Sequence, residues 1–304
     1  MTRELKPLAN KPFTSTRKSP DSLKPNQGDL AAGLYLLATP IGNAADISLR
    51  ALETLRSCDV IAAEDTRVTA KLLAIHGISR PLIPYNDHNG AEMRPKILGR
   101  LERGERVALV SDAGTPLVSD PGYKLVRAAI AAGASIIALP GPSAVLAALA
   151  LSGLPSDRFL FAGFLSPKPG ERRTMLEELK SVRATLIFFE SAQRLPETLA
   201  VMAEVLGNRP AAVARELTKL HEEVRRGPLG ELAAHYQTAG APKGEVTLLV
   251  GPPGEAKPDQ ARIDMALKAA LAFMPVKAAA EMIAGLTGAS RKQVYARALE
   301  LKNE

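Results

Sequence analysis

The sequence has little of what stabilises secreted proteins. Among its 304 residues there is one cysteine, Cys58, and no tryptophan. A single cysteine cannot form an intrachain disulfide, which is typical of proteins from a reducing compartment. Cys58 stands in the stretch LRSCDVIAAED, so we interpret it as a small buried hydrophobe rather than a nucleophile.

Long apolar runs and metal-binding motifs are also missing. No stretch approaches the roughly 18 to 20 apolar residues of a membrane span, and the segment MTRELKPLANKPFTSTRKSPDSLKPNQ has no apolar core of a secretory signal. We therefore expect a cytoplasmic protein with no membrane partner. The four histidines show neither HExxH nor a Cys/His spacing, so we expect no metal.

Two nucleotide-binding fingerprints are absent as well, because no GxGxxG follows the first apolar run and GxxxxGK[ST] does not occur. Instead, three loops rich in Pro and Gly each follow an apolar run: ATPIGN (38–43), SDAGTPLVSDPG (111–122) and PGPSA (140–144). A plain βα turn needs about two to six residues. The second loop is longer than this and contains two carboxylates, so we interpret it as a ligand site rather than as a simple connection between a strand and a helix. No lysine occurs in the three loops, which favours a cationic, amphipathic cofactor over a triphosphate.

The order of elements predicts an α/β fold. From Gly33 onward, strand-like runs such as Val107–Val110 alternate with segments whose apolar residues recur at helical spacing. This alternation is typical of a parallel sheet with helices on its faces. Asp46 is predicted to cap the first of these helices. We place a disordered basic tail at 1–32, a parallel-sheet domain at 33–153 and a second α/β domain at 154–252. Its strands are less regularly separated by helices, so we expect a mixed sheet there.

Residues 258–304 are predicted to form three short helices. The last two are joined by a glycine-containing turn and have helix-turn-helix spacing, and the final helix carries Arg291, Lys292 and Arg297. A three-helix packing cap fits the pattern equally well. The net charge is +7 and both ends of the chain are basic. This favours a polyanionic partner such as RNA, although exposed lysines also serve solubility alone.

Several motifs occur together and in order: ATPIGNAADISLRALE, AEDTR, SDAGTPLVSDPG, LPGPSA, SGLPSDRF, GFL, ARELTKLHEE and KGE. In this order they resemble the ribosomal RNA branch of the tetrapyrrole methylase superfamily, over roughly Gly33 to Gly251. The resemblance implies two α/β domains of the tetrapyrrole methylase type plus a helical extension, with S-adenosylmethionine as cofactor, usually in a homodimer. It also implies methyl transfer to the 2′-hydroxyl of a cytidine in the decoding region of 16S ribosomal RNA, free or in the small ribosomal subunit.

The cofactor residues implied by the resemblance come from both domains. They are Pro40, Asp112, Gly114, Thr115, Pro116, Ser143, Ala144, Arg215, Glu216 and Gly244.

A ribose hydroxyl is weakly acidic, so a base that accepts its proton would assist the transfer. Our candidates are Asp65, which ends a predicted strand in AEDTR, and His88. Asp65 is as well suited to cap the following helix, and a lone loop histidine is more often solvated. Relatives commonly read YHEHN where residues 85–89 read YNDHN. This chain keeps His88 and Asn89, and Asn89 is a candidate RNA contact.

Three arginines are predicted to contact RNA phosphate, because a guanidinium binds phosphate with two parallel hydrogen bonds. They are Arg67, Arg173 and Arg194. For Arg67 the alternative is an ion pair with the acidic residues of AEDTR, and for the other two it is a solvated surface charge. Residues 190–194 read ESAQR where relatives commonly read ESPHR, so no histidine base can act there.

Two functions of other classes remain open from the sequence. One is a methylase of a small tetrapyrrole-like molecule, which needs a large apolar cleft and no affinity for RNA. The other is a ribosome assembly factor without catalysis, which binds RNA whether or not the cofactor is present.

Overall fold

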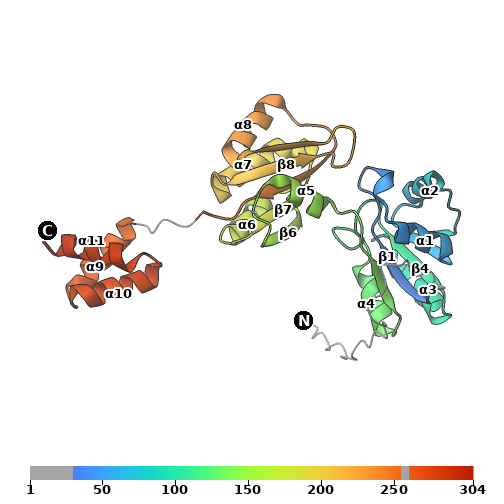
Figure 1. The fold of residues 1–304 in the computed structure, drawn as a ribbon, viewed down its shortest axis with the longest axis horizontal. Coiled ribbons are helices and arrows are strands. Elements are labelled where there is room, and N and C mark those ends of the chain that lie inside the picture. The colour runs from blue at the N-terminus through green and yellow to red at the C-terminus, as the bar shows by residue number, and fades with distance from the viewer. Residues whose placement is uncertain (1–29, 255–259, 304) are drawn as a thin grey trace. The chain divides into compact units, whose positions relative to one another are not determined.

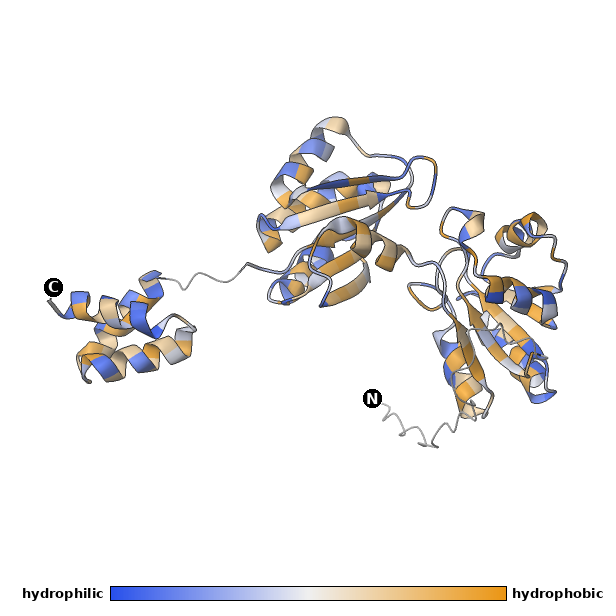
Figure 2. Ribbon diagram, viewed as in Figure 1, coloured by the Kyte–Doolittle hydropathy of each residue, from blue (hydrophilic) through white to orange (hydrophobic). Residues whose placement is uncertain are grey.

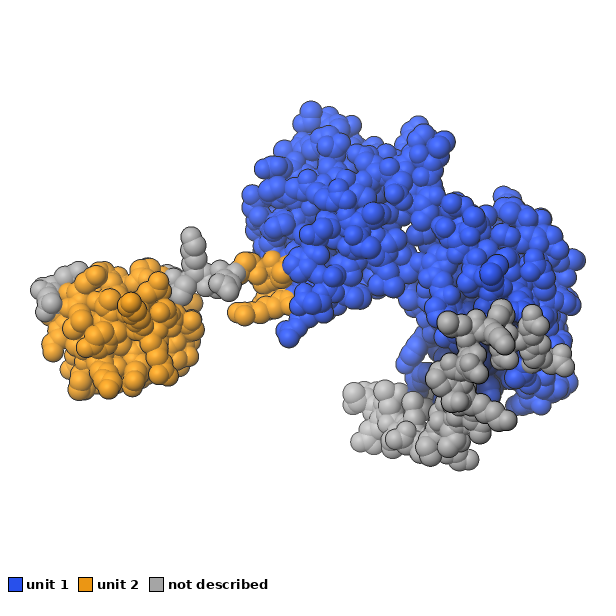
Figure 3. Space-filling model, viewed as in Figure 1, with its two compact units in different colours: residues 1–180, 184–251 blue, residues 181–183, 252–304 orange. Residues whose placement is uncertain are grey.

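The computed structural model describes residues 30–254 and 260–303, which form two compact units (Figure 3). The first unit extends to Gly251, apart from residues 181–183, and holds two β-sheets. The second holds the helices that follow Pro252. The tail predicted at 1–32 lies almost wholly outside the described residues.

The first sheet is parallel and five-stranded (Figure 1). Its three central strands are buried on both faces, as is typical of parallel sheets, and Figure 2 shows their hydrophobic character. The expected parallel sheet is therefore confirmed. In spatial order the strands are β3 (Leu82–Pro84), β2 (Val60–Ala63), β4 (Arg106–Val110), β1 (Gly33–Leu37) and β5 (Ile136–Leu139).

Helices cover both faces of this sheet. One core, which includes Leu55 and Leu73, packs α1 and α2 against one face. The other core, which includes Ile97 and Leu125, packs α3 and α4 against the opposite face. These helices are α1 (Leu49–Ser57), α2 (Thr66–Ile75), α3 (Gly90–Glu102) and α4 (Tyr123–Ala131).

Side-chain caps fix where these helices begin, and one of them corrects the sequence prediction. Asp46 does not cap α1 but lies in a short 3-10 turn, η1 (Ala44–Asp46). Ser48 is the cap, since its Oγ accepts a hydrogen bond from Ala51 N at 3.1 Å. A cap must directly precede the first helical residue, and Ser48 is the residue before Leu49.

The second sheet is mixed, as expected. Strands β6 and β7 are parallel, and the other neighbours are antiparallel. Its spatial order is β6 (Phe159–Phe164), β7 (Thr185–Ser191), β10 (Glu245–Val250), β8 (Pro210–Arg215) and β9 (Glu223–Pro228). The helices of this half are α6 (Pro169–Leu179), α7 (Leu195–Leu206) and α8 (Leu229–Ala239), with the short η2 (Ala192–Arg194) before α7.

Helix α5 (Ala144–Ser152) connects the two sheets. It follows β5 in the chain, but Val145 and Leu149 pack in one core with Ile187 and Leu249 of the second sheet. Ile41 of the loop after β1 belongs to the same core. The loops of the first sheet are thereby anchored to the second.

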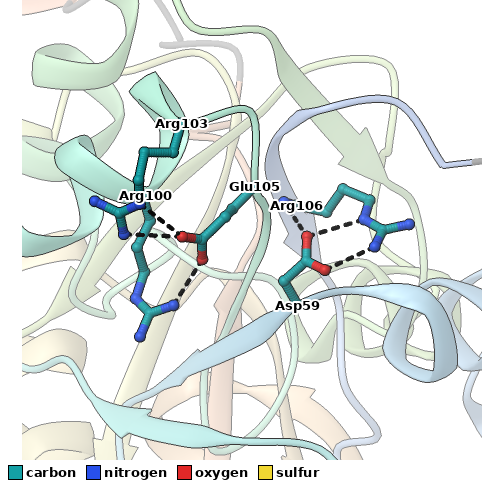
Figure 4. Close-up of polar contacts among 5 residues, drawn as sticks. All are labelled: Asp59, Arg100, Arg103, Glu105 and Arg106. Carbon is teal, nitrogen blue, oxygen red and sulfur yellow. Dashed lines mark hydrogen bonds and ion pairs between the residues drawn. The ribbon is translucent and has the colours of Figure 1, made fainter.

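Ion pairs occupy the amino-terminal edge of the first sheet (Figure 4). Asp59, just before β2, pairs with Arg106 at the start of β4 at 2.6 Å. The hydrogen bond from the Arg106 side chain lowers the pKa of Asp59 to about 2. Glu105 pairs with Arg100 at 2.6 Å and with Arg103 at 2.8 Å. Three arginines are thus matched by carboxylates at the edge opposite the Pro- and Gly-rich loops.

The second unit contains α9 (Gln260–Leu271), α10 (Val276–Thr287) and α11 (Arg291–Asn303). Leu267, Ile283 and Val294 belong to its own apolar core. Arg297 pairs with Asp264 at 2.7 Å and so helps to hold α11 to α9, whereas Arg291 and Lys292 are exposed. The three predicted helices are therefore present and pack on one another.

Because the second unit has its own core, we expect it to unfold separately from the two sheets. Leu267 is fully buried, and truncating such a leucine costs about 2 to 5 kcal/mol. Leu267→Ala should accelerate amide hydrogen exchange in 260–302 and leave exchange in both sheets unchanged. Acceleration in the sheets as well would contradict separate unfolding.

Candidate active site

Three loops meet beyond the carboxyl ends of neighbouring parallel strands. They follow β1, β4 and β5, which lie side by side in the sheet. Thr39 N donates to the Gly114 carbonyl oxygen at 2.8 Å, and Gly114 N donates to the Thr39 carbonyl oxygen at 3.0 Å. The Thr115 hydroxyl donates to the Pro142 carbonyl oxygen at 3.3 Å. The three loops identified in the sequence therefore form one polar assembly, at the edge where open α/β sheets bind ligands.

The backbone of the longest loop, 111–122, is strained. Leu117 and Ser119 have φ angles of 74° and 63°, in the left-handed region that side chains rarely adopt. Such residues cost of the order of 1 to 3 kcal/mol each and cluster at functional sites. Gly122 has φ 132°, and a Cβ there would lie 2.9 Å from Leu109 Cδ2. The loop is thus held in one conformation and is not a flexible connection.

Three carboxylates gather at this edge: Glu64, Asp112 and Asp120. Asp112 N donates to Glu64 Oε2 at 3.4 Å, and Asp65 N donates to Asp112 Oδ1 at 3.0 Å. Burial raises the pKa of all three carboxyl groups, and neighbouring negative charges raise it further. The pKa of Asp120 reaches about 6. The arrangement can attract a cation and can hold a proton near neutral pH.

Asp112 was predicted from the sequence as a cofactor residue, whereas Asp120 and Glu64 were not assigned to the site. Asp120 is marked by the repeat of the dipeptide SD at 111–112 and 119–120, and no comparable signal marks Glu64. Their burial could not be anticipated, because it depends on how the loop folds back over the ends of the strands.

The loop between β8 and β9 packs against the loop after β1. A Cβ at Gly42 would lie 2.4 Å from Lys219 Cγ and 2.9 Å from the Leu217 carbonyl oxygen, so only glycine permits this approach. Between them, Thr218 has φ 63°, and its Oγ1 is buried without a hydrogen-bond partner among the described residues. A buried polar atom left unpaired costs about 1 to 3 kcal/mol. The Thr218 hydroxyl is therefore suited to contact a ligand.

The predicted cofactor residues fall into two groups. Those of the first group lie in the three converging loops, and Ser143 also caps α5 by accepting from Leu146 N at 3.4 Å. Those of the second group lie where β8 ends and β10 begins. The first group is Pro40, Asp112, Gly114, Thr115, Pro116, Ser143 and Ala144, and the second is Arg215, Glu216 and Gly244.

The second group is held by contacts within the protein. The Arg215 guanidinium pairs with Glu223 at 3.0 Å. Glu216 Oε1 accepts a hydrogen bond from Glu245 N at 2.9 Å, and this bond lowers the pKa of Glu216. Gly244 has φ 94°, and a Cβ there would lie 2.2 Å from Glu216 Oε1. These residues shape the β8–β9 loop.

The two predicted bases have different surroundings. Asp65 caps α2 by accepting from Arg67 N at 2.8 Å, and it forms an ion pair with the Arg67 side chain at 2.6 Å. The side-chain hydrogen bond from Arg67 lowers the pKa of Asp65 to about 2, which makes Asp65 a weak base near neutral pH. His88 is exposed in the β3–α3 loop, where its backbone N donates to Asn86 Oδ1 at 3.1 Å.

The predicted RNA contacts all have partners within the protein. Arg67, paired with Asp65, has an 86% exposed side chain. Arg173 pairs with Glu204 and Arg194 with the buried Glu190, both at 2.5 Å. Asn89 donates from Nδ2 to the Pro84 carbonyl oxygen at 3.2 Å and accepts at Oδ1 from Asn86 N at 2.9 Å. Of these four residues, Arg67 is the most open to a polyanion.

A pocket of about 160 Å³ is lined by one of the three carboxylates, Asp120. The β3–α3 loop and the start of α3 form one wall, and residues 120–124 form the other. Asp120 therefore lies at the junction of the pocket and the longest loop.

In residues 30–254 and 260–303, no cluster of three or more His, Cys, Asp or Glu could hold a metal ion. Over the same residues, every helix is too short or too polar to span a membrane.

Comparisons with known proteins place this geometry in a family. The sequence profile of the Tetrapyrrole (Corrin/Porphyrin) Methylases matches residues 33–233, and that of the RsmI C-terminal HTH domain matches residues 257–302. A solved uroporphyrin-III C-methyltransferase of Thermus thermophilus, complexed with S-adenosylhomocysteine, shares the fold. Its TM-score is 0.52 at 19% identity, over 72% of this chain and 97% of that one.

Closer relatives cover nearly the whole chain. The Ribosomal RNA small subunit methyltransferase I of Mesorhizobium japonicum is 56% identical over 276 residues, which are 90% of this chain and 94% of the relative. The protein of that name from Erythrobacter litoralis is 56% identical over 273 residues, 90% of this chain and 96% of the relative. The chain therefore belongs to the tetrapyrrole methylases and, within them, to the ribosomal RNA small subunit methyltransferase I family.

Proposed function

We propose that this protein transfers the methyl group of S-adenosylmethionine to the 2′-hydroxyl of a cytidine in the decoding region of 16S ribosomal RNA. The observation that carries the proposal is the convergence of three Pro- and Gly-rich loops and three carboxylates beyond the parallel strands. The names of the relatives favour ribosomal RNA as substrate over a small tetrapyrrole, and favour catalysis over a purely structural role.

The residues at this edge fit S-adenosylmethionine. The cofactor carries a positive sulfonium and an ammonium group, and the edge offers Asp112 and Glu64 without a lysine in any of the three loops. The buried, unpartnered Oγ1 of Thr218 supplies a further polar contact. We assign cofactor binding to the two groups of predicted residues described above, with Glu64 and Thr218 added.

The cofactor supplies an activated methyl group, so the protein has chiefly to align the attacking oxygen and exclude water. Alignment needs a rigid frame, because the reacting atoms must be held about 3 to 3.5 Å apart. The hydrogen bonds between Thr39 and Gly114 and the strained backbone at Leu117 and Ser119 support this frame.

The proton of the ribose hydroxyl needs an acceptor. Of the two predicted bases, we favour His88, because the ion pair with Arg67 makes Asp65 a weak base. A neutral imidazole nitrogen can accept a proton as a general base. Asp65 then serves to begin α2 and to orient Arg67.

RNA phosphate would be bound by side chains that the sequence already singled out. We propose that Arg67 binds phosphate, since its side chain is largely exposed, and that Asn89, Arg173 and Arg194 contribute weaker contacts. In the second unit, Arg291 and Lys292 are exposed at the start of α11 and would be further phosphate contacts if the last two helices act as a helix-turn-helix.

The first prediction tests the reaction itself. Purified protein, labelled S-adenosylmethionine and small ribosomal subunits from cells lacking this methylation should give label on a ribose 2′-oxygen of 16S RNA. Asp112→Ala should weaken cofactor binding roughly 10- to 100-fold, because a contact to a charged group is lost.

Asp157→Ala is the matched control, since Asp157 is exposed and lies outside the converging loops. Its cofactor affinity, measured by calorimetry, should equal that of the unchanged protein. Cofactor binding without any transfer to RNA would instead indicate a small-molecule substrate, and no cofactor binding at all would indicate an assembly factor.

The second prediction concerns the raised pKa of Asp120. In the unfolded chain an aspartate titrates near 3.9, and in the folded protein burial raises this pKa to about 6. The protonated carboxyl therefore contributes stability below about pH 4, and this contribution is lost as the pH rises through 6.

Asp120→Asn should accordingly be more stable than the unchanged protein at pH 8, by roughly 1 kcal/mol once partial exposure is discounted. The difference should shrink towards pH 4. Urea unfolding at pH 4, 6 and 8 measures it, and Asp157→Asn serves as control. A stability difference that does not vary with pH would show that the folded and unfolded pKa values are alike.

The third prediction concerns assembly. We propose a homodimer, supported by the edge strand β6, where Phe159 and Phe164 are exposed. Exposed apolar edge strands invite pairing with a second chain. Sedimentation should give a dimer, which Phe164→Lys shifts towards monomer. A monomer in both proteins would rule this assembly out.

A further inference from the structure

The pocket beside Asp120 has the size of one six-membered ring. Its volume is about 160 Å³, and a cavity of about 150 Å³ in another protein holds one benzene molecule. A pyrimidine base is a single ring of this kind, whereas a purine has two fused rings. The pocket also opens at the carboxyl edge of the sheet, beside the loops assigned to the cofactor.

The walls of the pocket suit a planar ring. Tyr85 is 3% exposed and belongs to the core between the sheet, α3 and α4, so this wall is fixed. Tyr123, in the opposite wall, is 62% exposed at the start of α4. Unstacked bases in single-stranded RNA are commonly bound by stacking on such aromatic side chains.

The polar groups of the pocket include both an acceptor and a donor. Asp120 supplies the carboxyl group. Arg94 supplies a donor, because its Nε is buried and has no hydrogen-bond partner among the described residues. Buried donors are nearly always paired in folded proteins, so an unpaired one in a pocket indicates a ligand with an acceptor atom.

We propose that this pocket receives the cytosine base of the nucleotide to be methylated, with Asp120 and Arg94 reading its edge. The amino group of cytosine donates to the Asp120 carboxyl, as carboxylates do when they read cytosine in nucleic acids. The ring nitrogen N3 of cytosine accepts from Arg94. Uracil presents the opposite pattern, an acceptor at O4 and a donor at N3, and so loses these pairings. The inference rests on the proposed function, because it names the part of that substrate which selects the nucleotide.

One loop would then position both reactants. Its first half is joined to the other two loops through Gly114 and Thr115, and its last residues line the pocket. Asp112 and Asp120 thus stand at the two ends of one strained segment. A base held at one end and a cofactor held at the other have a fixed separation, which in-line transfer requires.

The test compares two substrates that differ in one base. Small subunits are prepared with cytidine or with uridine at the mapped nucleotide, and kcat/KM for methyl transfer is measured for each. The unchanged protein should prefer cytidine by about 10-fold or more. Asp120→Ala should methylate the cytidine substrate more slowly and bring the two rates within about threefold. Its affinity for S-adenosylmethionine should stay unchanged, and Asp157→Ala should keep the full preference.

A second variant distinguishes a loss of base recognition from a general loss of activity. Arg94→Met keeps the aliphatic part of the side chain and removes the donor, so it should also reduce the preference at unchanged cofactor affinity. The inference would be wrong if Asp120→Ala slowed methyl transfer to both substrates equally or weakened cofactor binding. Asp120 would then have a structural role or a role in cofactor binding. If the unchanged protein methylates neither substrate, the proposed function itself fails.

Discussion

The two backbone hydrogen bonds between Thr39 and Gly114 are the contact on which the site depends. They fasten the loop after β1 to the loop after β4, and Thr115 fastens the latter to the loop after β5. The same first loop meets the β8–β9 loop at Gly42, where no side chain could fit. Backbone atoms, rather than long side chains, therefore hold the loops of both sheets in register. This explains why these loops are rich in Pro and Gly.

Most of the fold was predictable because buried parallel strands are continuous apolar runs. The exceptions have physical causes. Strand β9, EVRRGP, is an edge strand with exposed charges, so its sequence does not stand out as a strand. Both Asp46 and Ser48 are good helix caps, and only the position of the first turn of α1 decides between them. Helix α5 is apolar on all sides, which predicts burial but not that it packs on the second sheet.

The site was predictable in outline and less so in its electrostatics. Sequence order brought the three loops to one edge, because parallel strands all end there. The partners of charged groups were not predictable, since they come from distant segments or from competing neighbours. Arg194 pairs with the buried Glu190, which its sequence setting did not suggest. The pair of Arg67 with Asp65 was one of two alternatives that the sequence offered, and the sequence alone could not decide between them. The environment of Asp120 likewise depends on how the loop 111–122 folds over the ends of the strands, where burial and the charges of Glu64 and Asp112 act on its carboxyl group.

Cys58 gives the protein a practical property. Its side chain is fully buried, and burial raises its thiol pKa to about 11. The reactive species of a cysteine is the thiolate, so this thiol is inert to maleimides near neutral pH. A cysteine introduced at an exposed position would be the one reactive thiol of the chain. Dyes or spin labels could then be attached at a chosen site without first removing the native cysteine, and the labelled enzyme followed on the ribosome.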